Sequence, residues 1–344
     1  MRFKQALLSN LANVSRIGGL GELAGRRHRG AGAIIVAHSV VEDPGEYLFD
    51  HLRTSAAFLE TILDHLRKAG IDIVPLDEAM RRLRENDARR FACFTFDDGY
   101  KDNLTVALPI FERYEAPFTV YVTTCHIEGT IDNWWSGLAE ILRNHERIEV
   151  EELGGHYEAR TLQEKARLYR QLKQAAENGT LSAAGISAFL KAYSIDMPEI
   201  VARDALTLDE LRELSSSPLV EIGAHTASHP RLSELGEAEA QFEMATNKEW
   251  LEDLLQHEIR HFAYPYGDPG SCGLREAKLA KMIGFDTAVT TRIGNLFAAH
   301  CEFSTALPRI RLFSSRENIN LVQFQLSGAA GALLNRAHGP VVTM

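Results

Sequence analysis

A regular alternation of short apolar runs with amphipathic helical segments constrains the fold of this 344-residue chain more than any other feature. Runs suited to buried strands occur at 33–37, 71–75, 91–96, 118–123, 219–224, 259–264, 285–290 and 309–313. Helical patterns lie between most of these runs, at 54–69, 77–86, 104–114, 233–256 and 273–283. Strands that alternate with helices are typical of a parallel sheet covered by helices. The sequence therefore predicts an α/β fold, and about eight such strands suit a (β/α) barrel.

The alternation breaks between residues 126 and 206. This stretch has helical patterns at about 161–177 and 182–193 but no convincing buried strand. Thr207 and Glu210 then have the spacing of a capping box, which starts a new helix. We therefore expect an N-terminal arm (1–30), a main domain (31–325) with a helical and loop insertion at about 126–206, and a C-terminal tail (326–344).

The amino-acid composition limits which partners the chain can bind and in which compartment it works. The chain has 47 acidic and 37 basic residues, and its net charge of −10 argues against binding to a nucleic-acid backbone. Its four cysteines are far apart, which excludes a thiolate zinc finger and a dense disulfide framework and fits a reducing compartment. No apolar run reaches the ~18 residues of a membrane span.

The N-terminal arm is basic and lacks the continuous apolar core of a secretory signal, so we expect a cytoplasmic protein. Its leucines recur at helical spacing, which makes a weak peripheral membrane contact an alternative to packing on the domain. The sequence specifies no oligomeric state.

Polar residues that could carry chemistry directly follow four of the expected strands. They are His38, the pair Asp97 and Asp98, the pair His225 and His229, and the segment Pro265-Tyr266-Gly267. The carboxyl ends of parallel barrel strands meet at one end of the barrel, where active sites are built. We therefore expect these residues to form a single site.

Two of these pairs suggest a metal. Asp97 and Asp98 are adjacent anions at the end of a buried strand, where at least one needs a cation or a proton. His225 and His229 are four residues apart, so on a helical turn both would face one ion. Two histidines and one carboxylate suit catalytic zinc and also non-haem iron. The ordinary alternatives are a helix cap for the aspartates and unrelated surface positions for the histidines.

Three further features have both a structural and a functional interpretation. Backbone N–H groups around Tyr266 could face a developing oxyanion, or the segment could be an ordinary turn. Trp135, next to Trp134, either belongs to a local core or offers a ring on which a sugar stacks. His38 is either a satisfied core or surface histidine or part of the site.

Three motifs, taken in order, resemble those of the NodB-type polysaccharide deacetylases. They are Thr95-Phe96-Asp97-Asp98-Gly99, His225-x-x-x-His229-Pro230 and Phe262-Ala263-Tyr264-Pro265-Tyr266-Gly267. The resemblance covers roughly residues 31–325, with 126–206 as an expanded region. It implies a distorted (β/α) barrel of about seven or eight strands that binds a divalent metal, usually zinc. It also implies hydrolysis of an N-acetyl, sometimes O-acetyl, group on a carbohydrate substrate.

Position by position, the resemblance makes Asp98, His225 and His229 the metal ligands and Asp97 the general base. It gives the segment of Pro265 and Tyr266 a contact with the substrate oxyanion through the backbone near Tyr266. The chemistry agrees with this assignment, because a metal can polarise an amide carbonyl and acidify a water whose proton Asp97 then takes.

The chain departs from the common family pattern at three places, one of which is the absence of the usual Asp/Trp segment. It has no Leu-x-His near the C-terminus to supply the general acid, and Ala263 stands where an arginine usually orients the base. The exported poly-N-acetylglucosamine deacetylases form a branch that resembles this chain and carries its acid histidine on the first strand, at the position of His38. We therefore expect His38 to be the acid, with His300 and His338 as weaker candidates, and Arg309 to replace the missing arginine in the substrate site.

Three other functions stay open at this point. The departures above would suit a catalytically impaired metal- and glycan-binding protein of the same fold. A barrel glycosidase would need two carboxyl groups about 5–10 Å apart, whereas adjacent strand residues point apart. An iron oxygenase with two histidines and one carboxylate would need a redox cosubstrate.

Overall fold

We describe the protein from a computed structural model, which covers residues 26–42, 52–131, 133–312, 317–335 and 339–344. Most of the N-terminal arm, for which packing on the domain and a peripheral membrane contact were the alternatives, lies outside the described residues, as does His338. Within the described ranges no helix has both the length and the apolar character needed to cross a membrane.

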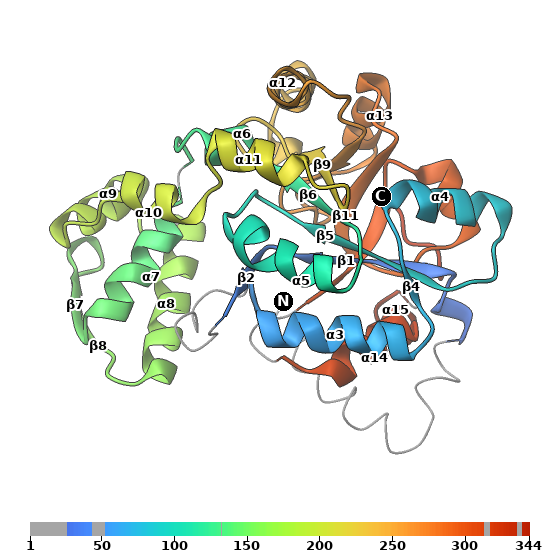
Figure 1. The fold of residues 1–344 in the computed structure, drawn as a ribbon. Coiled ribbons are helices and arrows are strands. Elements are labelled where there is room, and N and C mark those ends of the chain that lie inside the picture. Colours follow the sequence, from blue (N-terminus) through green and yellow to red (C-terminus); the bar gives the residue numbers. More distant parts are fainter. Residues whose placement is uncertain (1–25, 43–51, 132, 313–316, 336–338) are drawn as a thin grey trace.

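Seven parallel strands form a closed barrel (Figure 1). In order around the barrel they are β1 (Gly32–Ala37), β12 (Leu307–Arg311), β11 (Thr287–Ile293), β10 (His261–Ala263), β9 (Val220–Ala224), β6 (Phe118–Val122) and β5 (Phe91–Phe96). The barrel closes because β1 pairs with β12 on one side and with β5 on the other. An eighth strand, β4 (Asp72–Ile73), pairs with β5 outside the ring. The predicted distorted (β/α) barrel is therefore confirmed.

Side chains alternate between two hydrophobic layers. One layer fills the barrel with residues such as Ile34, Cys93, Tyr121 and Val289. Helix α4 (Leu76–Glu85) contributes its apolar face to the same layer, so it covers the end of the barrel where the strands begin.

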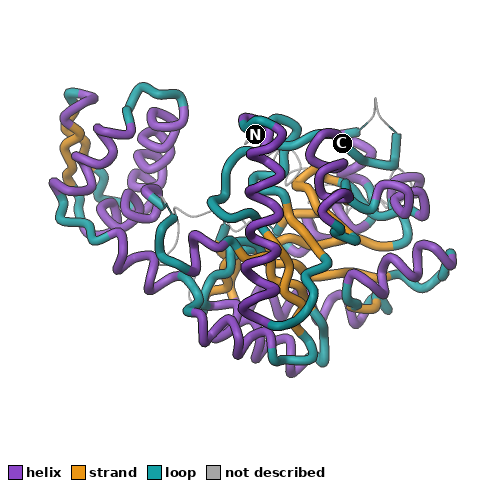
Figure 2. Tube along the Cα trace, turned by 90° about the horizontal axis from the view of Figure 1, so that it is seen from above, coloured by secondary structure: helices purple, strands orange, loops and turns teal. Residues whose placement is uncertain are grey.

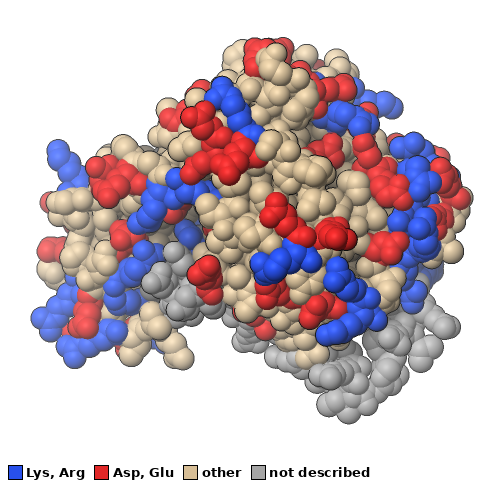
Figure 3. Space-filling view, viewed as in Figure 1, with Lys and Arg blue, Asp and Glu red and all other residues tan. Residues whose placement is uncertain are grey.

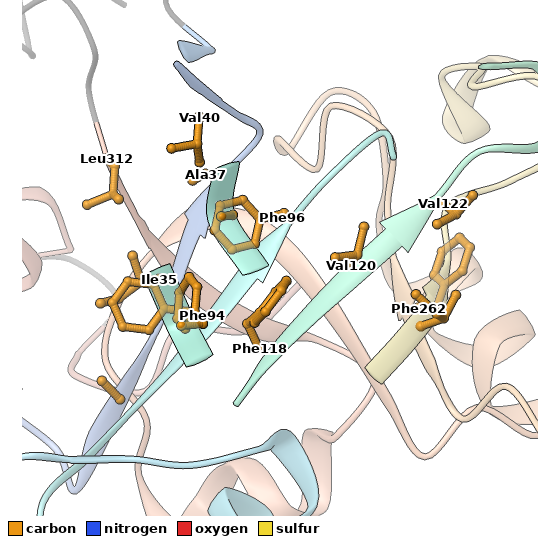
Figure 4. Close-up of a cluster of buried hydrophobic side chains, with 14 of the residues drawn as sticks. Ile35, Ala37, Val40, Phe94, Phe96, Phe118, Val120, Val122, Phe262 and Leu312 are labelled. Carbon is orange, nitrogen blue, oxygen red and sulfur yellow. The ribbon is translucent and has the colours of Figure 1, made fainter. Parts of the chain in front are cut away.

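The other layer lies between the strands and the outer helices and contains Phe94, Phe96, Phe111 and Phe118 (Figure 4). Edge-to-face ring contacts, for example 5.5 Å between the centroids of Phe96 and Phe118, hold it together.

Helices surround the strands (Figure 2). They are α3 (Ala56–Lys68), α5 (Leu108–Arg113), α11 (Leu208–Ser215), α12 (Glu237–Leu255), α13 (Leu274–Ile283), α14 (Ile319–Leu326) and α15 (Ala329–Leu334). The expected helix at 104–114 begins as a π-helical turn, η3 (Asn103–Ala107), before α5. Thr207 and Glu210 form the expected capping box of α11. Two short strands, β2 (Ser39–Val41) and β3 (Arg53–Ser55), pair beside the barrel.

The segment expected as an insertion builds a group of elements beside the barrel (Figure 1). After the short α6 (Thr124–Ile127) come α7 (Trp134–Asn144), β7 (Arg147–Val150), β8 (Gly155–Glu158), α8 (Leu162–Glu177), α9 (Ala183–Ala192) and α10 (Met197–Asp204). These elements share their own hydrophobic cluster. The antiparallel pair β7–β8 corrects the expectation of helix and loop alone. Its strands are four residues long and β7 buries only Ile148 and Val150, so its pattern is too short to recognise in the sequence.

Charges of both signs are interspersed on the face of the described residues in Figure 3, with no continuous basic surface there.

The tight barrel interior leads to a stability prediction at Gly223 of β9. A methyl group there would lie 2.5 Å from the ring of Tyr121 and 2.9 Å from the carbonyl oxygen of His261. We expect Gly223→Ala to lower the free energy of unfolding by about 1–3 kcal/mol through overpacking. Urea unfolding measures this. Gly236→Ala is the control, because no atom lies within 4 Å of its added methyl group. Equal stability of the two variants would contradict the closed barrel.

Candidate active site

The carboxyl ends of the barrel strands bring most of the predicted site residues together. Asp97 and Asp98 follow β5, His225 follows β9, and His38 follows β1. Asp98, His225 and His229 form one cluster in which the potential ligand atoms all lie within 4.8 Å of one another. Residues that are far apart in the sequence therefore meet at one end of the barrel, as expected for this architecture.

The distances within this cluster fit a shared cation. The Oδ1 atom of Asp98 lies 3.4 Å from Nε2 of His225 and 3.5 Å from Nε2 of His229. These separations exceed those of good hydrogen bonds. Ligands at about 2.0–2.1 Å from a tetrahedral zinc ion are roughly 3.3–3.4 Å apart, which is close to both distances.

The chemistry of the two imidazoles also fits a cation. Nδ1 of His225 lies 2.7 Å from the carbonyl oxygen of Ala263, which can only accept, so Nδ1 donates and Nε2 faces Asp98. Burial lowers the pKa of His225, but the Asp98 and Asp97 carboxylates outweigh it and raise that pKa, so this position attracts positive charge. Burial lowers the pKa of His229 to about 4, which leaves its imidazole neutral at pH 7.

An unusual backbone orients the ligands. Asp98, Thr226 and His229 have φ angles of 80°, 69° and 58°, in the left-handed region that few residues other than glycine adopt. His225 and His229 therefore do not lie on a helical turn, as their spacing suggested. Positive φ angles in the loop after β9 bring the two rings to a centroid distance of 5.0 Å.

Two buried polar residues hold this loop and the Asp98 backbone. The ring of His126 donates from Nδ1 to the carbonyl oxygen of Asp98 at 2.8 Å. Asn247 accepts from the backbone N–H of His225 at 2.7 Å and donates to the carbonyl oxygen of Val122 at 3.1 Å. Each side chain thus ties a ligand residue to the rest of the molecule.

Our sequence analysis missed both of these residues, although each had a signal. His126 comes soon after a predicted strand, like the other site residues. Asn247 is a polar residue on the buried face of α12. His126 was overlooked because the expected insertion began at that residue. Asn247 was overlooked because it is one polar position in a long helix.

Asp97 is buried and paired with Arg309 of β12. The guanidinium donates to both carboxylate oxygens at 2.7 Å, and it also donates to the carbonyl oxygen of Thr290 at 2.8 Å. Burial alone would raise the pKa of Asp97, but Arg309 outweighs it and lowers that pKa. Asp97 is therefore held as a carboxylate. Arg309 lies beside Asp97 as expected, but it is fully buried, so it contacts Asp97 rather than an open substrate surface.

His38 and Tyr266 lie on the open side of the site. Nε2 of His38 is 3.9 Å from Oδ2 of Asp97, and the His38 side chain is 22% exposed. Tyr266, which follows Pro265, has a φ of 61° and an exposed ring 5.1 Å from the ring of His229. The guanidinium of Arg231 lies 4.2 Å from the centre of that ring, a neighbour that the sequence analysis also missed.

Two sequence candidates take structural positions instead. Trp135 lies on α7 against the hydrophobic cluster of the insertion, with the amine of Lys173 5.9 Å from its ring centre. His300 is buried, and its two ring nitrogens contact the backbone N–H of Phe297 and the carbonyl oxygen of Val342. Both nitrogens are occupied, so His300 is unsuited to the role of general acid.

A buried carboxylate beside a histidine–histidine–aspartate cluster at the carboxyl ends of barrel strands is an arrangement suited to an enzyme active site. The family model "Polysaccharide deacetylase" matches residues 84–179 and 186–285, more than half of the chain. The chain therefore belongs to the polysaccharide deacetylase family and is a hydrolase of the carbohydrate deacetylase class. A search of curated proteins finds no match.

Solved structures share the fold. The deacetylase PplD of Streptococcus pyogenes, in complex with acetate, is 21% identical with a TM-score of 0.56, covering 85% of this chain and 97% of that one. IcaB from Ammonifex degensii is 16% identical with a TM-score of 0.54, covering 87% and 97%. The polysaccharide deacetylase BC0361 from Bacillus cereus is 16% identical with a TM-score of 0.54, covering 86% and 68%.

The Arg309–Asp97 pair leads to a second prediction. Arg309→Met leaves Asp97 as an unpaired buried charge, so we expect a loss of about 3–5 kcal/mol in the free energy of unfolding. Adding Asp97→Asn removes that charge and should recover part of the loss. Urea unfolding of the single and double variants measures the coupling. Arg212→Met is the control, since its pair with Asp209 is exposed and contributes about 0–1 kcal/mol. If the changes in the free energy of unfolding caused by Asp97→Asn and Arg309→Met simply add, the two side chains are not coupled and the pair is contradicted.

Proposed function

We propose that this protein is a metal-dependent deacetylase that removes N-acetyl groups, and secondarily O-acetyl groups, from a carbohydrate. The observation that carries the proposal is the convergence of Asp98, His225 and His229 beside the ionised Asp97. Family membership supports the reaction class. PplD was solved in complex with acetate, which is the product that this reaction would release.

Asp98, His225 and His229 would hold a divalent ion, with zinc as the first candidate because two imidazoles and a carboxylate are a typical catalytic zinc set. Such an ion, when bound, polarises a carbonyl and lowers the pKa of water. The carbonyl oxygen of Ala263 orients the ring of His225, and the ring of His126 holds the backbone of Asp98, through the hydrogen bonds described above.

Asp97 is suited to the role of general base. It lies next to the ligand Asp98, and its pairing with Arg309 keeps it ionised and fixes its orientation. A carboxylate held in this way accepts the proton of the attacking water. Arg309 is then a positioning residue that acts through Asp97.

His38 is suited to the role of general acid. An amine leaves poorly as an anion, so the departing nitrogen needs a proton. His38 is partly exposed and lies 3.9 Å from Asp97, on the open side of the site. Tyr266 and Pro265 would contact the sugar and the oxyanion from β10, with the exposed ring of Tyr266 offering a stacking surface.

We keep a cytoplasmic location and a precursor or soluble glycan as part of the proposal. All four cysteines are free, in agreement with a reducing compartment.

The first test separates metal binding from turnover. We expect Asp98→Ala and His229→Ala to lose the zinc ion of this site and acetate release together. Asp97→Asn should retain zinc and lower release by about 10²–10⁴-fold, because only the base is removed. Atomic emission gives the metal content, and acetate release from N-acetylglucosamine oligomers gives turnover. Asp253→Asn, an exposed carboxylate on α12, is the control.

Full turnover of Asp97→Asn would refute its role. Zinc that the native chain binds and Asp98→Ala loses, without any turnover, would favour the alternative of an impaired glycan-binding protein.

The second test concerns the proton donor. We expect His38→Gln to retain zinc and to lower acetate release from an N-acetylated sugar by about 10²-fold or more. The loss should be much smaller with 4-nitrophenyl acetate, because nitrophenolate leaves without protonation. The ratio of kcat/KM values for the two substrates measures the role. His156→Gln, a highly exposed histidine in the insertion, is the control. An equal loss on both substrates would rule out His38 as the acid.

A further inference from the structure

A second cluster of potential metal ligands lies at the opposite end of the barrel. It consists of Asp77, Glu221 and His261, whose ligand atoms all lie within 4.8 Å of one another. Asp77 is in the first turn of α4, Glu221 is near the start of β9, and His261 is the first residue of β10. The cluster therefore connects the helix that covers the N-terminal end of the barrel to two barrel strands, away from the catalytic end.

His261 is the buried centre of this cluster. Its side chain is fully buried, and Nδ1 lies 2.8 Å from the hydroxyl oxygen of Thr287. Nε2 lies 3.0 Å from Oε1 of Glu221 and 3.7 Å from Oδ1 of Asp77, yet it has no hydrogen-bond partner. At 3.0 Å the Glu221 oxygen is near enough to accept a hydrogen bond from Nε2. The contact is therefore not a hydrogen bond because its angle is unsuitable.

An off-axis contact of this kind is also what two ligands of one ion make with each other. Ligand atoms around one metal point at the metal and not at each other, and they lie about 3–3.5 Å apart at zinc bond lengths of about 2.0–2.2 Å. The Nε2 atom of His261 and the Oε1 atom of Glu221 have this separation. Thr287 would hold the other ring nitrogen, as a second hydrogen bond commonly does for a ligating histidine.

The surrounding charge also favours a cation. Arg260 pairs with Asp286 and with the other carboxylate oxygen of Asp77, so Oδ1 of Asp77 stays directed toward His261. The Arg260 guanidinium thus pairs with two carboxylates, those of Asp77 and Asp286, while the third, that of Glu221, faces His261. The excess negative charge matches a divalent ion.

We propose that Asp77, Glu221 and His261 form a second divalent-metal site, of the zinc type, that fastens α4 to the start of β9 and β10. One imidazole and two carboxylates are ligands that zinc accepts, and partial exposure of Asp77 and Glu221 leaves room for water in the remaining position. Metal at the N-terminal end of a barrel would act on stability and not on the reaction. This proposal does not depend on the proposed function.

The test uses the full chain with its catalytic ligands removed. In Asp98→Ala/His229→Ala we expect one zinc ion per chain to remain, measured by competition with a chromophoric chelator. Zinc at a hundredfold excess over its Kd should raise the thermal midpoint of that protein by about 5 °C. Adding Glu221→Gln, which keeps the shape of a partly exposed side chain, should abolish both effects, as should adding His261→Gln. Adding His257→Gln should leave both unchanged, because His257 contacts Ser215 instead of the cluster.

Each outcome is decisive for this site. No zinc in Asp98→Ala/His229→Ala, or zinc that persists after Glu221→Gln, would overturn the proposal. A different result would contradict the proposed function: the native chain would then bind no more zinc than Asp98→Ala/His229→Ala binds. Circular dichroism of each variant confirms that the barrel is folded.

Discussion

The site depends on how the protein keeps two adjacent carboxylates charged at the end of a buried strand. Side by side in a dry environment, Asp97 and Asp98 would repel each other and take up a proton. The bidentate bond from Arg309 compensates Asp97, and the two imidazoles, with the proposed ion, compensate Asp98. These arrangements require β5, β9 and β12 to be held in one closed barrel, since each strand contributes one partner. The closed pairing of β1 with β5 and β12 is therefore a condition for the chemistry as well as for the fold.

Much of the fold could be predicted because buried parallel strands are continuous apolar runs. All eight expected runs overlap strands of the main sheet, most of them within two residues of their expected bounds. The hairpin β7–β8 could not be predicted in this way, because a four-residue strand with one exposed face gives only two apolar positions. The pair β2–β3 is shorter still. Tertiary packing, not local pattern, determines such elements.

The site was predictable in its residues but less so in its geometry. The motifs gave Asp97, Asp98, His225 and His229, and their order along the chain gave the common end of the barrel. The spacing of the two histidines suggested a helix, whereas left-handed residues at Thr226 and His229 produce the same convergence. His126 escaped notice because it coincides with the expected start of the insertion, and Asn247 because it is one polar position in a long helix. Trp135 was ambiguous for a similar reason, since an aromatic pair looks the same in a core and in a cleft.

The central claim is that a metal held by Asp98, His225 and His229 works together with Asp97 to hydrolyse an acetamide. The measurement that tests it most directly is acetate release by the native protein from a panel of N-acetylated oligosaccharides, before chelation, after chelation and after zinc is added back. The account predicts that release stops on chelation and returns with zinc. Release that continues unchanged in the chelated, metal-free protein would contradict it.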